Sequence, residues 1–417
     1  MAEPTASAQP AAAPGVWLSL AVTTAIQVMT SMALLTLPVM APEVARALGV
    51  SPALVGGYVA VAYIAAMIGS LVGGTLVRRM GAIRVSQMGL VCCGFGLALC
   101  ASSSLPAIVL GALVIGMGYG PITPASSHLL ALTTPAHRMS LVFSIKQTGV
   151  PAGGMLAGAL IPGALLLVGW QATLLAMAVV CMLWAALAQP LRASLDADRQ
   201  PGQALALGAL LRPVRMVLRH KGLAALALCS FLFSAVQVSL TTYLVTFLND
   251  SLAMSLVAAG AALSVSQLAG VVGRIAWGDV ADRWLGARST LIALSACMVA
   301  GCLLTAMLQP DTPRWWLWVV MALVGASGIG WNGVYLAEVA RQAPSGQTSA
   351  ATGGTLLFTF MGVVFGAPAF GALSSAAGSY RVGFAALAVP AAVALGVLLW
   401  RARRAARAAP TAPTSQP

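Results

Sequence analysis

The chain has 417 residues, of which 59% are hydrophobic and only 7% are charged, and its formal net charge is +13. A soluble domain usually carries about 25% charged residues, and a mean hydropathy of +0.92 is typical of an integral membrane protein. The basic residues lie in short loops between apolar spans. Their distribution therefore argues against a nucleic-acid partner and in favour of the lipid bilayer.

Residues 1–15 (MAEPTASAQPAAAPG) lack the basic region of a secretory signal and predict a disordered N-terminal tail. Twelve apolar stretches follow, each about long enough for one membrane helix. They are 16–40, 53–77, 85–103, 106–131, 140–167, 171–189, 222–248, 256–278, 289–308, 315–338, 350–375 and 382–400. The runs are continuous rather than alternating, which excludes barrel strands. The predicted fold class is an all-α integral membrane protein with twelve transmembrane helices.

The placement of Lys and Arg predicts the orientation of these spans. Seventeen of the 22 basic residues fall on the side of the N-terminus, three fall on the other side, and Lys146 and Arg274 lie within spans. The excess predicts that both termini are cytoplasmic, in a bacterial-type inner membrane. Residues 190–221 form the one long cytoplasmic connection, and we expect six-helix bundles at 16–189 and 222–400 and a basic tail at 401–417. The second half of 190–221 is either a basic amphipathic helix on the inner leaflet or a solvated linker.

Motifs that the sequence lacks argue against several classes of protein. The seven cysteines fall within apolar stretches and show no metal-ligand spacing with histidine, so we expect neither a metal site nor disulfides. No HExxH motif, paired membrane aspartates or Ser/His dyad indicates an enzyme. No GxxxxGK[ST] loop or cofactor motif is present, so any active transport must use a gradient rather than ATP.

The two halves of the chain contain similar segments, which indicates an internal repeat. GGTLVRRMGAIR (73–84) follows the second span, and WGDVADRWLGAR (277–288) follows the eighth. The corresponding pairs are Gly74 and Gly278, Arg79 and Arg283, Gly81 and Gly286, and Arg84 and Arg288. Spans four and ten also correspond, with Gly116 matching Gly325. Repeated halves are a recurrent plan of secondary transporters, whose substrate site lies where the halves meet.

With these features the chain resembles the major facilitator superfamily over nearly its whole length. The family's loop motif, Gly-x-Leu-x-Asp-Arg-x-Gly followed by Arg or Lys, is similar to Gly278, Asp282, Arg283, Gly286 and Arg288, with one extra residue. In the first loop, Arg78 stands where the family has Asp. The resemblance implies that such loops latch the cytoplasmic side, so we expect a latch at 277–288 and no standard one at 73–84. It also implies a monomer. The strings SIKQTGVPAGG (144–154) and GWNGVYLAEVA (330–340) resemble the cyanate-permease-like bacterial branch.

The fifth span carries two devices that affect helix packing. Gly149 and Gly153, and Gly154 and Gly158, are four residues apart, a spacing that lets helices approach closely. Pro151 removes a backbone hydrogen bond and should kink the helix. A kinked, smooth helix suits rocking against a neighbour, although static packing explains the same residues.

Two cations lie within the predicted spans. Lys146 is about two turns inside the cytoplasmic end of span five, where it either faces an aqueous cavity or snorkels to the headgroups. Arg274 is one turn before Gly278, which fits a gate arginine bonded to carbonyls or to Asp279 and Asp282; direct contact with substrate is the alternative. None of the nine acidic residues lies near a bilayer midplane. The field in a central cavity should therefore be positive and favour anions.

Uncharged polar side chains recur in the spans that would line such a cavity. They are Gln27, Gln147, Gln237, Tyr243, Gln267 and Asn332. A buried amide needs a partner, which is either another helix or a solute.

The leading hypothesis is a secondary carrier of a small organic or inorganic anion, with a proton or a counter-anion as the coupled ion. The alternative is an exporter of neutral or hydrophobic compounds. A membrane-embedded enzyme and a solute sensor on a carrier scaffold are the remaining classes.

Overall fold

The computed structural model describes residues 15–50, 54–202 and 211–408, and every regular element within these ranges is helical. The predicted tail at 1–15 lies outside the described residues except for Gly15. In the first half, the elements are α1 (Val16–Val39), α2 (Ala41–Leu48), α3 (Leu54–Met80), α4 (Ala82–Cys100), α5 (Leu105–Tyr119), α6 (Ile122–Thr133), the 3-10 turn η1 (Ala136–Arg138), α7 (Met139–Gln147) and α8 (Gly149–Leu187).

The connection between the halves contains α9 (Arg192–Leu195) and α10 (Arg212–Arg219). In the second half, the elements are α11 (Lys221–Leu252), α12 (Leu256–Val280), the π-helical turn η3 (Ala281–Leu285), α13 (Gly286–Met307), α14 (Arg314–Gly328), α15 (Asn332–Gln342), α16 (Thr348–Ala376) and α17 (Tyr380–Ala408).

Ten helical segments in the described part of the chain are long and apolar enough to cross a membrane. Two of them, Ala136–Leu187 and Ala258–Met307, have 52 and 50 residues, about twice the length that one crossing needs. A glycine with positive φ divides each long segment: Gly169 (φ 78°) lies inside α8, and Gly286 (φ 74°) is the first residue of α13, directly after η3. Both divisions fall between stretches that the sequence predicts as separate spans.

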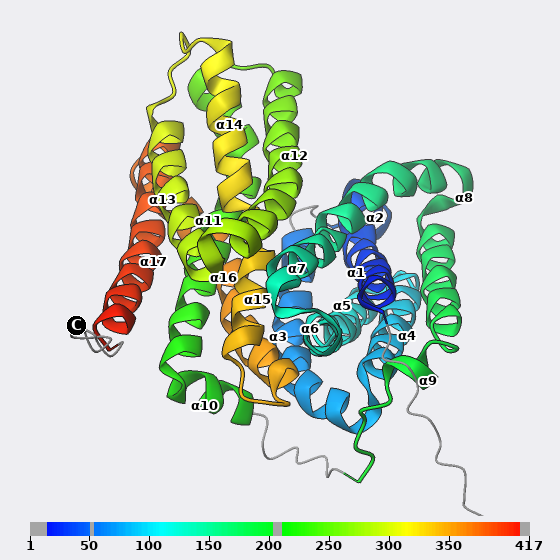
Figure 1. The fold of residues 1–417 in the computed structure, drawn as a ribbon. Helices are drawn as coiled ribbons and strands as arrows, with labels where there is room; N and C mark the ends of the chain where they lie inside the picture. Colours follow the sequence, from blue (N-terminus) through cyan, green and yellow to red (C-terminus); the bar gives the residue numbers. More distant parts are fainter. Residues whose placement is uncertain (1–14, 51–53, 203–210, 409–417) are drawn as a thin grey trace, which may run out of the picture.

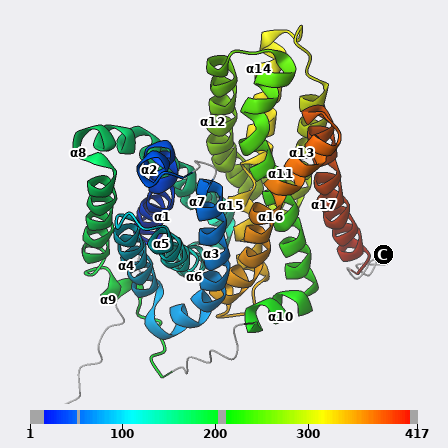
Figure 2. The ribbon, with the colours of Figure 1, turned by 180° about the vertical axis from the view of Figure 1, so that it is seen from behind.

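The helices form two groups that follow the order of the chain. Helices α1 to α8 lie on one side of the molecule and α11 to α17 on the other, in both views (Figures 1 and 2). The groups meet where α7 packs against α12 and α15, and where α16 packs against α3 and α6. Helices α9 and α10 mark one end of the molecule, at the bottom of Figure 1, which we call the linker end.

Helix α10 is amphipathic, as the sequence allows. Its Pro213 and Val217 are buried, while Arg212, Arg215 and Arg219 are exposed. The helix packs against α16, α11 and α3, and the carbonyl of Pro213 lies 2.7 Å from the position a Cβ of Gly354 would take. Its buried side chains, Pro213 and Val217, thus contact protein, whereas the apolar Leu218 is exposed. The placement of this helix on the inner leaflet stays a prediction.

Candidate functional site

A cavity of about 210 Å³ lies between the two groups of helices. Its lining residues come from both halves of the chain: Tyr63, Tyr119, Thr123, Gln147, Val150, Ser234, Gln237, Val238, Thr241, Arg274, Trp331, Asn332, Leu356, Thr359, Phe360 and Val363. Tyr63, Tyr119 and Phe360 form an aromatic cluster across the interface, with ring centroids 5.6–6.4 Å apart. We call this space the central cavity.

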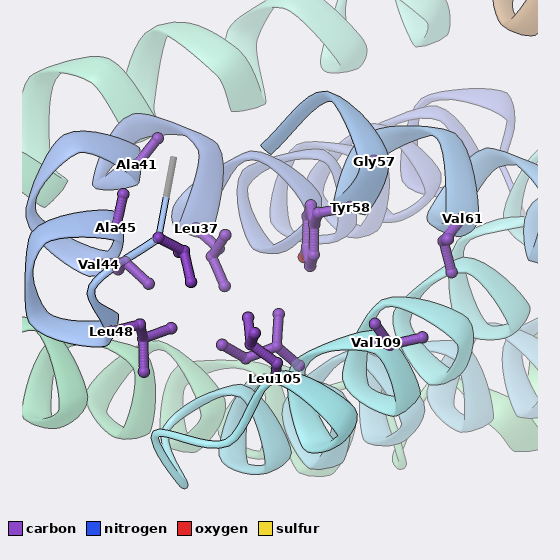
Figure 3. Close-up of a pocket in the computed structure, with 12 residues that line it drawn as sticks. Leu37, Ala41, Val44, Ala45, Leu48, Gly57, Tyr58, Val61, Leu105 and Val109 are labelled. Carbon is purple, nitrogen blue, oxygen red and sulfur yellow. The ribbon is translucent and has the colours of Figure 1, made fainter. Parts of the chain in front are cut away.

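A second cavity, of about 300 Å³, lies within the first half (Figure 3). Apart from Gly57 and Tyr58, its described lining is aliphatic and comes from α1, α2, α3 and α5, together with Val50. Among the described residues, the hydroxyl of Tyr58 has no hydrogen-bond partner. A wall of this kind offers no charged group and no amide to a polar solute. The central cavity is therefore the candidate site.

Lys146 lies behind the wall of the central cavity. Its side chain is 1% exposed, and its Nζ donates to Oε1 of Gln27 (2.8 Å), Oε1 of Gln147 (2.9 Å) and Oγ1 of Thr123 (3.4 Å). All three acceptors are neutral. The amine neither reaches the headgroups nor lines the cavity directly, whereas Gln147 and Thr123 do line it. The positive charge thus sits one side chain away from the cavity.

Gln27 completes this cluster from α1. Its Oε1 accepts from Lys146 and from Oγ1 of Thr123 (3.3 Å), and its Nε2 donates to Oγ of Ser31 (3.2 Å). Glycines bring the helices close enough for this: Gly149 and Gly153 of α8 lie against α1, where a Cβ would stand 3.0 Å from the Cβ of Gln27 and 2.6 Å from the Cβ of Ser31. A Cβ at Gly154 would lie 3.2 Å from Leu35 and one at Gly158 would meet nothing, so it is Gly149 and Gly153 that make the close approach.

Arg274 is the cation that lines the cavity itself. Its residue is 2% exposed; Nε donates to the carbonyl of Ile329 (3.0 Å), and one Nη donates to the carbonyl of Gln147 (2.5 Å). No carboxylate among the described residues pairs with it. Arginine has five N–H donors, so three have no acceptor in the described part of the chain. Guanidinium N–H donors form strong, charge-assisted hydrogen bonds with anionic acceptors such as carboxylates.

Two amide side chains of the second half, Gln237 and Asn332, also line the central cavity. Oε1 of Gln237 accepts from Nε1 of Trp331 (2.9 Å) and from Nδ2 of Asn332 (3.2 Å). Gln267 and Tyr243 are not among the lining residues. Gln267 is exposed on α12, seven residues before Arg274 and hence on the same face about two turns further from the linker end. Tyr243 instead stacks on Phe370, with ring centroids 4.7 Å apart.

The linker end below the cavity is closed by contacts between the halves. Carboxylate oxygens of Asp282 accept from the backbone N–H groups of Ser140 (3.1 Å) and Leu141 (2.7 Å) at the start of α7. Arg341 donates to the same carboxylate (3.0 Å). Gly278 is needed at this contact, because a Cβ there would lie 2.7 Å from Oγ of Ser144. A carboxylate at a helix N-terminus is stabilised by free N–H groups and by the helix dipole.

The remaining residues of the second loop stay within their own half. Arg283 pairs with Asp279 (2.7 Å), and Arg288 lies 3.9 Å from Glu338. The side-chain hydrogen bonds that join the halves within the described residues lie at the cavity wall or between the cavity and the linker end. They are Ser70 to Gly353, Arg274 to Gln147, Arg341 to Ala136, and the N–H groups of Ser140 and Leu141 to Asp282.

The first loop makes its contacts differently. Gly74 packs against α16, where a Cβ would lie 2.7 Å from Cα of Ala350. Gly81 has φ 94°, and the carboxyl of Asp196 fills the space where its Cβ would be. Asp196 accepts from the N–H groups of Ile83 (2.8 Å) and Arg84 (3.0 Å). Arg79 is half-buried and has no side-chain hydrogen bond in the described structure.

Two carboxyl groups of the connection titrate under opposite influences. Burial raises the pKa of Asp196, against the lowering effect of the two N–H groups that it accepts from. The hydrogen bond from His128, whose Nε2 lies 2.6 Å from Oδ2, lowers the pKa of Asp198. Both contacts bind the connection to the first half.

Sequence reasoning missed Asp196, Thr123, Thr241 and Arg341. Thr123 and Thr241 carry no signal in an apolar span, because a threonine there usually bonds its own helix. Arg341 is three residues after Glu338 and resembles any loop arginine. Asp196 is separated from its partner Ile83 by 113 residues, so no local pattern connects them.

Comparisons with known proteins agree on the family. The family model of the Major Facilitator Superfamily matches residues 20–358. The Escherichia coli fucose:proton symporter FucP is similar in structure (TM-score 0.73, 16% identity, 93% of this chain and 99% of that chain), and so is FucP in the outward conformation (0.74, 17%, 93% and 99%). The human organic anion transporter MFSD10 is also similar (0.71, 17%, 92% and 100%). A search of curated proteins found no match. With a family model that covers most of its length, the chain belongs to the Major Facilitator Superfamily of membrane transporters.

Proposed function

We propose that the chain is a secondary carrier that moves a small organic or inorganic anion across the membrane by alternating access. One observation carries the proposal: the guanidinium of Arg274 lies at the wall of a cavity between the halves, with Lys146 one side chain behind it and no carboxylate in the described lining. The field there is positive, and a volume of about 210 Å³ suits a solute smaller than a typical drug.

The architecture that goes with this function is twelve transmembrane helices in two pseudo-symmetric six-helix bundles, at 16–189 and 222–400, joined by a linker at 190–221. We place the linker end in the cytoplasm of a bacterial-type inner membrane, with both termini on that side, because most Lys and Arg residues gather there. Equivalent glycines support the repeat: Gly116 lies on the carbonyl of Ala62 in α3, and Gly325 lies on the carbonyl of Ser266 in α12. We propose a monomer of the cyanate-permease-like branch, from strings 144–154 and 330–340.

In this orientation, the closed contacts at the linker end support an assignment to the outward-facing state. An anion from outside would bind the free N–H edge of Arg274, and the amides of Gln147 and Asn332 would complete its hydrogen bonding. Lys146 adds positive potential from behind and orients the amide of Gln147 by bonding its oxygen. Separation of the halves at the linker end would then open the cavity to the cytoplasm. A proton or a counter-anion supplies the driving gradient.

A neutral solute is the competing candidate. Gln147, Gln237 and Asn332 can bind hydroxyl groups, and the proteins of similar structure include FucP and the proton:xylose symporter XylE (TM-score 0.71, 14% identity, 93% of this chain and 95% of that chain). A neutral solute would leave the free donors of Arg274 without an anionic partner. The exporter of hydrophobic compounds is disfavoured for the same reason.

The test is a thermal-shift screen of the purified protein at constant ionic strength. The probes are sodium formate, acetate, oxalate and cyanate against sodium chloride, with xylose, fucose and a neutral hydrophobic dye for the competing functions. We expect at least one of the four anions to raise the unfolding temperature saturably, because a ligand that binds only the folded state stabilises it.

Arg274→Gln should abolish that anion-dependent shift, and Lys146→Gln should weaken it. Arg381→Gln is the matched control: it also removes one arginine, and Arg381 donates to the carbonyls of Ala306 and Leu308 at the opposite end of the molecule. A shift with xylose, fucose or the dye and none with the anions would replace the proposal by the competing one. An anion shift that survives in Arg274→Gln would remove Arg274 from the site.

A further inference from the structure

The carbonyl of Gln147 has no partner in its own helix. Helix α7 ends at Gln147 and α8 begins at Gly149. In a continuous α-helix, this carbonyl would accept from the N–H of the residue four positions on. That residue is Pro151, which has no N–H. Regular bonding resumes directly afterwards, because Ala152 donates to Thr148 (3.0 Å). Pro151 therefore leaves the carbonyl of Gln147 without its helical donor. Because this carbonyl is buried, it needs a hydrogen-bond donor from elsewhere in the protein.

The donor comes from the other half of the molecule. One Nη of Arg274 donates to the carbonyl of Gln147 (2.5 Å), and its Nε donates to the carbonyl of Ile329 (3.0 Å). Ile329 lies directly after the end of α14, where that helix gives way to α15. One buried guanidinium thus joins the break between α7 and α8 to the break between α14 and α15. The same group lines the central cavity.

We propose that Pro151 is a positioning residue for Arg274. By leaving the carbonyl of Gln147 free, it holds the guanidinium across the interface, closes the linker end, and presents the unused N–H edge to the cavity. When the halves separate at the linker end, Arg274 must leave this carbonyl and loses the orientation that serves an anion. Affinity would then be high with the linker end closed and lower with it open. Only this last consequence rests on the proposed function.

A purely structural role for Pro151 predicts different behaviour. If the proline only kinks the helix or fits the packing against α1, its replacement would act in the same way whether or not Arg274 is present. If it acts through Arg274, removal of the arginine removes its effect. A double-mutant cycle separates the two.

The experiment measures the distance between spin labels at His137 and Ser345, which are exposed on opposite halves at the linker end. The half-buried Cys92 and Cys297 are first replaced by serine. Pro151→Ala restores the backbone N–H, which then donates to the carbonyl of Gln147 in place of Arg274. We therefore expect the ratio of molecules with a closed linker end to those with an open one to fall about tenfold. Arg274→Gln should cause a similar fall, and the double variant should fall no further.

Pro162→Ala is the matched control within the same helix. The carbonyl that Pro162 leaves free belongs to Gly158, which receives no side-chain donor from the described residues, and no atom lies within 4 Å of the position of its Cβ. This variant should keep the wild-type distances. Pro151→Ser, which also restores the N–H, replaces Pro151→Ala if that variant does not fold.

Wild-type distances in both Pro151 variants would overturn the proposal, and so would effects of Pro151→Ala and Arg274→Gln that add in the double variant. The distances are measured without any solute. The spin-label result can therefore overturn the role of Pro151 without affecting the evidence for anion binding. A failure to detect anion binding likewise leaves the role of Pro151 untouched.

Discussion

Loops 73–84 and 277–288 occupy equivalent places in the two halves, yet they hold different parts of the molecule together. Both contain a glycine with positive φ, Gly81 at 94° and Gly286 at 74°. In the second loop, Asp282 reaches the start of α7 in the other half. In the first loop, the equivalent position is Arg78, and the carboxylate comes from Asp196 of the connection. The origin of the carboxylate decides whether the loop latches the interface or only its own half.

The two sides of the linker end consequently close by different means. On the side of the second loop, closure depends on a charged group with N–H and arginine donors. On the side of the first loop, α3 and α16 meet through small residues, with Gly74 against Ala350 and Ser70 donating to the carbonyl of Gly353 (3.3 Å). Close packing of small residues is how helices associate in a membrane. Charge changes should therefore affect one side and size changes the other.

The largest effect is expected for Asp282→Asn. It removes the charge that Arg341 and the N-terminus of α7 share, which should cost the closed linker end about 2–3 kcal/mol. The His137 to Ser345 spin-label distances should shift toward the open state. Asp279→Asn is the matched control, because its pair with Arg283 is exposed and lies within one half, and it should cost less than about 0.5 kcal/mol. Equal shifts in the two variants would contradict the latch.

The next effect compares Gly81→Ala with Gly286→Ala. Both place a side chain in a backbone conformation that essentially only glycine adopts (φ 94°, ψ 159° and φ 74°, ψ 153°), which costs about 1–3 kcal/mol. At Gly286 a Cβ meets nothing within 4 Å, whereas at Gly81 it collides with the carboxyl of Asp196. Thermal unfolding should therefore show the larger loss of stability for Gly81→Ala. A larger loss of stability for Gly286→Ala would mean that the carboxyl of Asp196 does not fill the space beside Gly81.

A smaller effect is expected for Asp196→Ala. Loss of the bonds to the N–H groups of Ile83 and Arg84 should lower the free energy of unfolding by about 1–2 kcal/mol, as for an N-terminal cap. The spin-label distances at the linker end should stay as in the wild type, because the hydrogen bonds of Asp196 join the connection to the first half alone. A shift toward the open state would show that the first loop also latches the interface.

The smallest effect concerns the pH dependence of the connection. The hydrogen bond from His128 holds the pKa of Asp198 below its ordinary value of 3.8. A lowered pKa in the folded state gives stability that is present above the ordinary value and is lost as the pH falls through the lowered one. The difference in unfolding temperature between wild type and Asp198→Asn should be full at pH 5 and shrink below pH 4. A difference that stays constant down to pH 3 would contradict the assignment.

The sequence predicted the helical membrane class and the breaks near Gly169 and Gly286, because hydropathy and glycine report directly on them. It also selected Lys146 and Arg274, because a cation in an apolar span needs a partner. It did not predict which of the two lines the cavity. Helical periodicity predicts the face of the helix on which a side chain lies, but not the hydrogen-bond acceptors on a neighbouring helix. The amine of Lys146 donates to Gln27 and Thr123 on neighbouring helices and is therefore held behind the cavity wall.

Other features depend on residues that are distant in the sequence. Asp196 occupies the space left by Gly81 only because the connection folds back onto the first half. Gln267 and Tyr243 belong to the right helices but not to the cavity wall, since depth along a tilted helix is set by packing. One partner of the bond between Arg274 and Gln147 could be predicted from the sequence, because Pro151 leaves a backbone carbonyl without its helical donor. Only the structure identifies Arg274 as the donor that replaces it.

The most direct test of the anion carrier is counterflow in proteoliposomes. Vesicles loaded with an excess of unlabelled formate, acetate, oxalate or cyanate should accumulate the same labelled anion through the wild-type protein and through Arg381→Gln, but not through Arg274→Gln. Accumulation of labelled xylose or fucose instead, or of an anion at the wild-type rate by Arg274→Gln, would contradict the central role given to the cationic cavity.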